Sequence, residues 1–280
     1  MRTVLVILYI GLALNSFGQK SNNQVVLIKG QKFSVKTTST QEADMGMGME
    51  MKNHTSSENK FYVINANDKS YTISSTLTGI KISMDMMGQQ ANYDSDLKED
   101  SASEIGKSIT TLNIPDTLTV DKFSAETIAN KKTAPDTKKD EETNPLEGLF
   151  ESLGSQNADM ALSEAFLIIP AGKKPGDSWV DSTSAKDMKT VRTYTIKSLD
   201  KNIAFINVVG NIEGNMKTEA NGMQLTVTMS TKINSEITVN SKTSLVSKRD
   251  TKADITGNLE MMGQSLPITG KATTTSVYEY

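Results

Sequence analysis

The chain has 280 residues, no cysteine, and 30 lysines and arginines against 33 aspartates and glutamates, which gives a net charge of −3. This acidic balance argues against nucleic acid as a partner, and the absence of thiols excludes disulfides, thiolate metal sites, a cysteine nucleophile and a lipid anchor on a cysteine. A chain of this length can bury a core without such cross-links.

Residues 1–18 have the pattern of a cleavable signal peptide. Arg2 precedes the uncharged apolar run VLVILYIGLAL, which is much shorter than the roughly 20 residues of a membrane-spanning helix. The small residues of the Ser-Phe-Gly phrase that follows fit a signal peptidase site, so we expect cleavage near Gly18-Gln19 and a periplasmic or secreted product. No later segment reaches spanning length, so we expect no transmembrane helix.

Residues 19–130 are predicted to form an N-terminal β-rich half. A first apolar stripe in this half occupies alternate positions, as one face of a strand does, and consists of Phe33, Val35, Ala43, Met45, Met47, Met49 and Met51. A second apolar stripe changes from odd to even positions between Leu77 and Ile80, which predicts a β-bulge at Thr78-Gly79.

The phrase Met-Met-Gly-Gln occurs twice, at 86–89 and at 261–264, each time after an apolar strand. Glycine supplies the positive φ that tight hairpins need, so both phrases predict hairpin turns. The shared phrase also raises the hypothesis that the two halves of the chain arose by duplication.

Helical signals occur between the halves. The Ser-Ala-Ser-Glu phrase at 101–104 has capping-box spacing and predicts a short helix toward Ile109. Residues 131–160 begin with a charged run that predicts a solvated linker. The Asn144-Pro145 pair then predicts the start of a short amphipathic helix, whose apolar stripe at helical spacing is Leu146, Leu149, Phe150 and Leu153.

Residues 161–280 are predicted to form a C-terminal β-rich half. From Met223 to Val239 apolar and polar residues alternate, except at Thr231 and Ser235, and a polar turn follows at 240–243. Strands of this length favour a strongly twisted sheet. We therefore predict a mainly β fold, with long curved antiparallel strands in a half-barrel or clam-like arrangement and one or two short helices between two β-rich halves.

The phrase Pro-Gly-Asp-Ser-Trp at 175–179 accompanies a leader and methionine-rich alternating strands. In this combination the chain resembles an uncharacterised family of exported β-rich proteins from Bacteroidota-type bacteria that carries a domain of unknown function. The resemblance implies an exported β-rich protein, and it supplies no catalytic residue.

Catalytic and metal-binding motifs are absent from the sequence. Because His54 is the only histidine, neither a Ser-His-Asp triad nor a histidine metal cluster can form, and G-x-S-x-G and H-E-x-x-H are missing. The acidic run at 94–100 approaches calcium-loop spacing, but Lys98 and Glu99 occupy a ligand position and the turn-glycine position. We therefore expect no enzyme activity and no cofactor.

Three hypotheses for function remain open. The first is a structural or interaction role, or binding of an apolar, lipid-like molecule or an envelope component, in a concave sheet face. That face is predicted to be lined by Met45, Met47, Met49, Leu225, Val227, Met229 and Leu149.

The second hypothesis is a Cu(I) or Ag(I) site, because thioethers are soft ligands. Its ligands would be Met45, Met47, Met49, Met51 and His54. The third is an outer-membrane β-barrel, whose strands also alternate and which often ends in an aromatic residue, as the chain does at Tyr280.

Overall fold

The computed structural model of the chain describes residues 24–44, 46, 48–109, 111–131, 158–185, 188–220, 223–261 and 264–280. The predicted signal peptide, the charged linker from residue 132 onward and the predicted helix at 146–153 lie outside these residues. None of the helices in the described part of the chain is long and apolar enough to cross a membrane.

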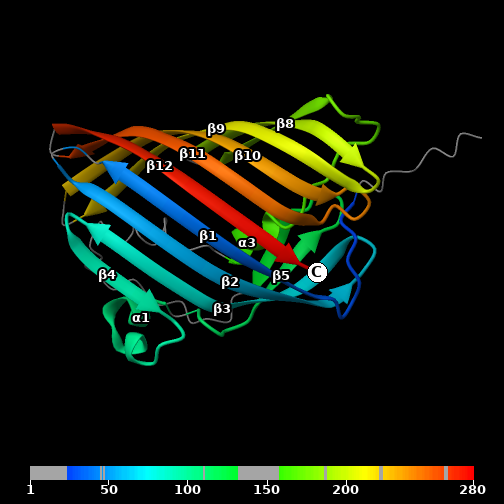
Figure 1. The fold of residues 1–280 in the computed structure, drawn as a ribbon, viewed down its shortest axis with the longest axis horizontal. Helices are drawn as coiled ribbons and strands as arrows, with labels where there is room; N and C mark the ends of the chain where they lie inside the picture. The colour runs from blue at the N-terminus through cyan, green and yellow to red at the C-terminus, as the bar shows by residue number, and fades with distance from the viewer. Residues whose placement is uncertain are drawn as a thin grey trace, which may run out of the picture.

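The described strands form a single twelve-stranded sheet (Figure 1). The strands are β1 (Lys32–Asp44), β2 (Glu50–Ala66), β3 (Ser70–Met86), β4 (Gln89–Asp94), β5 (Asp116–Asp121), β6 (Thr127–Lys131), β7 (Ser178–Ala185), β8 (Met188–Asp200), β9 (Ile203–Ala220), β10 (Met223–Asn240), β11 (Val246–Met261) and β12 (Gln264–Glu279). Their order in the sheet is β6-β5-β3-β2-β1-β12-β11-β10-β9-β8-β7, and β4 pairs with the second half of β3.

The predicted fold class is confirmed. Each ladder between these strands is antiparallel, and β9 and β10 reach 18 residues. Long strands coil as they twist, and Figure 1 shows them curving into a half-barrel. The sheet is open, with β6 and β7 at its described edges. The closed sheet that the outer-membrane hypothesis requires is therefore not formed by the described residues.

The two β-rich halves meet in the middle of the sheet. β1 to β6 come from the first half and β7 to β12 from the second, and the pairing of β1 with β12 joins them. This ladder runs from Ser34 opposite Glu279 to Asp44 opposite Thr269. The first and last strands of the chain are thus neighbours.

The parity change in β3 is confirmed as a bulge. Glu58 of β2 lies opposite Gly79, and the next residue, Asn59, lies opposite Leu77. Thr78 is therefore the extra residue, and it moves the buried positions from odd to even numbers between Tyr71 and Ile80.

The methionine stripe is divided by a hairpin, so the prediction that it occupies one strand is wrong. β1 ends at Asp44 and β2 begins at Glu50. Gly46 and Gly48 between them have φ angles of 75° and 77°, which a strand cannot accommodate. Met51 consequently lies on β2. At the predicted 86–89 turn, Met87 and Gly88 also have positive φ, and the hairpin from β3 to β4 is confirmed.

Two of the short helices lie within the first half, between β4 and β5, and one lies between β6 and β7. They are the 3₁₀-helix η1 (Glu99–Ala102), α1 (Glu104–Ser108) and α3 (Ala158–Ser163). The cap of α1 is Ser103, whose Oγ accepts a hydrogen bond from Gly106 N at 3.0 Å. The predicted cap, Ser101, instead donates from its hydroxyl to Lys98 O within the preceding turn.

The hydrophobic core occupies one end of the sheet, which we call the proximal end. The strand β1 starts there and β12 ends there, and α3 packs against the same side of the sheet, the inner face. Tyr278 Oη donates to Ala161 O at 3.3 Å and so ties β12 to α3. The largest fully buried side chains are Phe61, Ile73, Leu118, Leu162, Ile206 and Ile237.

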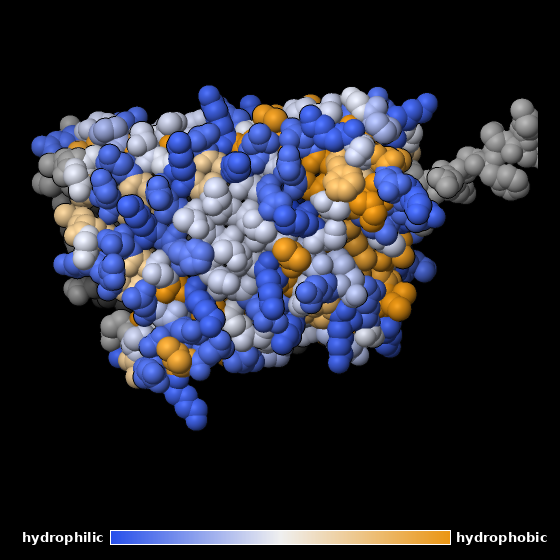
Figure 2. Space-filling view, in the orientation of Figure 1, coloured by the Kyte–Doolittle hydropathy of each residue, from blue (hydrophilic) through white to orange (hydrophobic). Residues whose placement is uncertain are grey.

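The outer face is mostly hydrophilic. Figure 2 shows polar side chains over β1, β2, β3 and β12, with apolar surface gathered at the proximal end. Tyr62, Ile64 and Tyr280 are among the exposed apolar residues of the chain. The alternation of each strand thus separates a wet outer face from a largely dry inner face.

Candidate functional site: the inner face of the sheet

A row of small hydroxyl side chains crosses five strands of the inner face. Strand registers place Ser235 opposite Thr251, Thr251 opposite Thr274, Thr274 opposite Ser39, and Ser39 opposite Thr55. Ser235 Oγ lies 2.8 Å from Thr251 Oγ1, and Ser39 Oγ lies 3.0 Å from Thr274 Oγ1. The hydroxyls therefore hydrogen-bond to one another across the strands.

Two neighbouring rows widen this polar zone. Toward the core, Arg249 lies opposite Ser276, and Ser276 lies opposite Thr37, whose hydroxyl is 3.0 Å from that of Ser276. Toward the other end of the sheet, Gln41 lies opposite Asn53. We call the polar side chains of these three rows the hydroxyl belt: Ser235, Thr251, Thr274, Ser39, Thr55, Ser276, Thr37, Ser57, Gln41 and Asn53.

The border of the belt with the core holds unsatisfied polar groups. Asn59 is 1% exposed, and neither its Nδ2 nor its Oδ1 has a hydrogen-bond partner. Ser75 Oγ, on the neighbouring strand, is also buried without a partner. A buried polar group without a partner costs about 1–3 kcal/mol, so this border reduces the stability of the fold.

Beyond the belt, the inner face becomes apolar again. On β9 to β12 the inward positions hold mainly aliphatic side chains, which we call the distal patch: Ile212, Val227, Met229, Ile233, Ile255, Leu259, Leu266 and Ile268. Val227 is buried and the other side chains are half-buried. The distal patch is thus less completely covered than the proximal core.

Glycines allow the distal patch to pack closely. Gly210 on β9 lies opposite Ile233, and a Cβ at Gly210 would lie 2.9 Å from Ile233 Cγ1. Gly257 on β11 lies opposite Met229, and a Cβ there would collide with Thr228 O. The neighbouring long side chains therefore lie over the glycines.

Both arginines of the described residues are on the inner face. Arg192 on β8 lies opposite Asp181 of β7, which carries the opposite charge. Arg249 lies opposite Ile237 and Ser276 instead. Its Nη2 donates to Glu164 O at 3.3 Å, whereas its Nε is buried without a partner.

The phenols near Arg249 are neutral at neutral pH. Burial raises the pKa of Tyr278 above 10.0, and the Glu164 carboxylate raises this pKa further. Burial likewise raises the pKa of Tyr194. Neither phenol therefore supplies a negative charge to Arg249.

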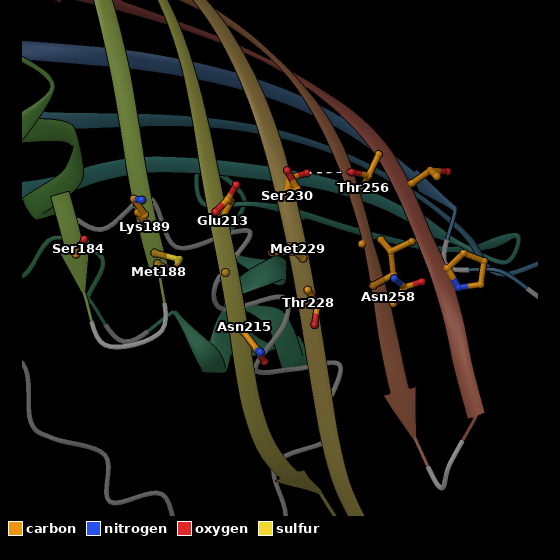
Figure 3. Close-up of a pocket in the computed structure, with 15 residues that line it drawn as sticks. Ser184, Met188, Lys189, Glu213, Asn215, Thr228, Met229, Ser230, Thr256 and Asn258 are labelled. Atoms are coloured by element: carbon orange, nitrogen blue, oxygen red, sulfur yellow. Dashed lines mark hydrogen bonds between the residues drawn. The ribbon is translucent and has the colours of Figure 1, made fainter. Parts of the chain in front are cut away.

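The distal strands also carry a wide groove of about 1190 Å³ (Figure 3). The groove is centred on one cross-strand row of inward-facing residues on β8 to β12: Met188, Gly214, Met229, Gly257 and Ile268. Most of the other lining residues, such as Glu213 and Thr228, are neighbours of this row along the strands. Thr256 Oγ1 donates to Ser230 O within the groove at 3.3 Å. The groove is open and includes part of the distal patch, because both Met229 and Ile268 line it.

The model of DUF6263, a family of unknown function, matches residues 68–246. The chain belongs to this family. The predicted resemblance to a family with a domain of unknown function is thus confirmed. No curated protein matches the sequence.

Two solved structures resemble this DUF6263 chain at low sequence identity. A structure of lipovitellin, described for its lipid–protein interactions, is 8% identical with a TM-score of 0.48, and the match covers 89% of this chain and 25% of that one. The chain thus spans about a quarter of lipovitellin. An outer membrane channel from Pseudomonas putida F1 is 9% identical with a TM-score of 0.27, over 92% of this chain and 98% of that one.

Of the seven cleft residues predicted from the sequence of this DUF6263 chain, two lie together in the structure. Val227 and Met229 are both in the distal patch, on the same face of β10. Met49 is half-buried in the turn before β2. Leu225 lies on β10, but its side chain is outside the described residues, as are Met45, Met47 and Leu149.

The proposed soft-metal ligands do not share one face. Met51 is 2% exposed on the inner face of β2, whereas His54, three residues later, is on the outer face, with its Nδ1 3.1 Å from Thr40 Oγ1. No group of three acidic, histidine or cysteine side chains in the described parts of the chain could hold a metal ion. Copper binding by the methionines alone stays a prediction.

The acidic run at 94–100 is neutralised from within the chain. Lys81 Nζ lies 2.8 Å from Asp94 Oδ2 and 3.0 Å from Asp96 Oδ2. The hydrogen bond from Lys81 lowers the pKa of Asp94. The lysine thus occupies the position that a bound cation would take.

Sequence reasoning missed the hydroxyl belt and Arg249. One signal was the pair of exceptions to the apolar alternation of β10, Thr231 and Ser235, since Ser235 is a member of the belt. The other signal was the scarcity of arginine, which occurs only at Arg2, Arg192 and Arg249. Neither signal gives the cross-strand register that assembles the belt.

Proposed function

We propose that this DUF6263 protein is an exported, non-enzymatic protein that binds an apolar, lipid-like molecule on the inner face of its sheet. The distal patch carries this proposal. Its aliphatic side chains lie on four adjacent strands, on the same face as the packed core, yet most are only half-buried.

Partial exposure of this patch gives an apolar ligand its binding free energy. Removing apolar surface from water contributes about 25 cal/mol per Å², so a ligand that covers the exposed parts of the patch is favoured. The long strands extend this surface well past the belt that borders the core. Ligand sites of this kind are mostly apolar and largely preformed.

A non-enzymatic role is supported by the positions of the reactive groups. The single histidine, His54, is exposed on the outer face and thus separated from the patch by the sheet. The sequence has no cysteine. Export is supported by the leader pattern of residues 1–18.

Binding is tested by native mass spectrometry of the mature protein, without the predicted leader, after purification from bacterial membranes. The delipidated protein is also titrated with oleate. The variant Ile255→Asp places a charge in the patch, and Thr273→Asp places it on the outer face of the neighbouring strand β12, opposite Lys252. We expect Ile255→Asp to weaken binding at least tenfold and Thr273→Asp to leave it unchanged.

A ligand-free mass together with no oleate binding by the unsubstituted protein would overturn the proposal. Equal loss in both variants would also contradict it, because the loss would then not depend on the inner face. Export is tested separately by sequencing the amino terminus of the secreted product, which we expect to begin at Gln19.

A further inference from the structure

We infer that the ligand is a long-chain carboxylate, whose head is bound by Arg249 and the hydroxyl belt and whose chain lies on the distal patch. This inference rests on the proposed function, and it adds the chemical class of the ligand and its orientation on the sheet.

The distribution of cations is the first observation. The described lysines of β1, β2, β10, β11 and β12 all occupy strand positions of the outer face: Lys32, Lys36, Lys52, Lys60, Lys232, Lys248, Lys252 and Lys271. The two described arginines occupy strand positions of the inner face. Arginine suits a partly buried site for an acid, because its planar guanidinium matches a carboxylate with two parallel hydrogen bonds.

Arg249 has the capacity for such a partner. Its side chain is fixed by the bond from Nη2 to Glu164 O, and it takes part in none of the described ion pairs. Its Nε is buried and unpartnered. A cation that is partly buried without an ion-pair partner destabilises the protein, and a bound carboxylate would remove this penalty.

The hydroxyl belt continues the polar surface from Arg249. Ser276 lies directly opposite Arg249, and Thr251 is two residues away on the same face of β11. Each hydroxyl has one proton to donate and two lone pairs to accept, so hydroxyls paired across strands keep capacity for a further bond. Asn59, beside Ser57 on β2, adds a buried amide with no partner.

The order of these features along the strands sets the orientation. On β11 the inward positions run from Arg249 through Thr251 and Ala253 to Ile255, at about 3.4 Å per residue. The head is thus bound near the proximal core, and the chain extends about 20 Å to the distal patch. One guanidinium supplies one positive charge, which matches a carboxylate head.

The test uses three ligands with the same chain and different heads: oleate, oleyl alcohol and methyl oleate. Each is titrated against the delipidated full-length protein and against four variants, with thermal unfolding as a check of folding. We expect the unsubstituted protein to bind oleate at least tenfold more tightly than methyl oleate.

Arg249→Met should remove this preference and leave the affinity for methyl oleate unchanged, whereas Arg249→Lys should retain part of it. Lys248→Met, one residue away on the outer face, should bind all three ligands as the unsubstituted protein does. If Arg249→Met does not fold, Arg249→Lys and Thr251→Val still test the head site. Each of these two variants should lower the affinity for oleate more than the affinity for methyl oleate.

Equal affinity for the three heads, or no difference between Arg249→Met and Lys248→Met, would overturn the inference and leave the proposed function standing. Tighter binding of an oleoyl lysophosphatidate than of oleate would overturn the assignment of a carboxylate. Failure of the unsubstituted protein to bind any of these ligands would instead overturn the proposed function.

Discussion

Ser235 and Thr251 hydrogen-bond to each other through their side chains across β10 and β11, with 2.8 Å between the two oxygens. Ser235 is 3% exposed, so neither water nor another described group replaces this partner for it. The pair shows how the sheet accommodates hydroxyls on a face that is otherwise apolar.

Ser235→Ala should lower the free energy of unfolding by about 1–2 kcal/mol, because it leaves the Thr251 hydroxyl without its partner. The double variant Ser235→Ala with Thr251→Val should recover part of this loss. Urea unfolding measures both. The control is Ser178→Ala, which removes an exposed hydroxyl pair with Thr195 and should change stability by less than about 0.5 kcal/mol. A larger loss in the control than in Ser235→Ala would contradict the argument.

Asn59→Leu should stabilise the protein by about 1 kcal/mol, because it replaces two unpartnered buried polar atoms with an apolar group of similar size. Asn234→Leu, at an exposed position of β10, is the matched control and should have little effect. The midpoint of chemical unfolding is the measurement. A loss of stability in Asn59→Leu would show that the amide has a partner in solution.

Gly210→Ala should destabilise the sheet by about 1–3 kcal/mol, because its Cβ would come within 3.0 Å of both Ile233 Cγ1 and Val191 O. Ile233→Ala removes both atoms that lie over the glycine, Cγ1 and Cδ1. The loss in the double variant should therefore be smaller than the sum of the two single losses, and a double-variant cycle by thermal unfolding measures the coupling. Additive losses would mean that Ile233 does not limit the space at this position.

Alkaline pH should destabilise the protein through Tyr278. Burial raises the pKa of the folded phenol above 10.0, its value in the unfolded chain, so above pH 10 the unfolded state releases a proton that the folded state retains. The free energy of unfolding should then fall as pH rises from about 10. Below this pH the contribution of Tyr278 is complete.

The measurement is the free energy of unfolding by urea at pH 8 and pH 11. Tyr278→Phe removes the titrating group and should show a shallower fall over this interval, although it also loses the hydrogen bond to Ala161 O. Tyr62→Phe, at a position 43% exposed, is the control and should keep the original slope. An equal fall in the unsubstituted protein and in Tyr278→Phe would exclude Tyr278 as the cause.

The sequence predicted local structure well where alternation and glycine determine it. The long strand β10 and the bulge at Thr78 follow from the parity of the apolar residues, since a strand repeats every two residues. The prediction that the residues from Phe33 to Met51 form one strand was wrong, because the alternation of apolar residues continues unchanged through a turn with an odd number of residues. Only the positive φ of Gly46 and Gly48 reveals the hairpin there.

The candidate site could not be predicted, because it depends on contacts between distant strands. Ser39 and Thr274 are 235 residues apart in the chain and still hydrogen-bond to each other. Each residue alone is an ordinary strand hydroxyl. Its membership of the belt follows from registers that no local pattern contains.

The pairing of β1 with β12 also constrains how the protein folds. Val35 pairs with Tyr278 in the middle of the sheet, so this ladder cannot form until nearly the whole chain has been synthesised. Contacts of such large sequence separation form slowly, because a long loop must close first. β1 can therefore pair with β12 only late in folding. A chain truncated before β12 would leave β1 and β11 as unpaired edges that are prone to aggregation.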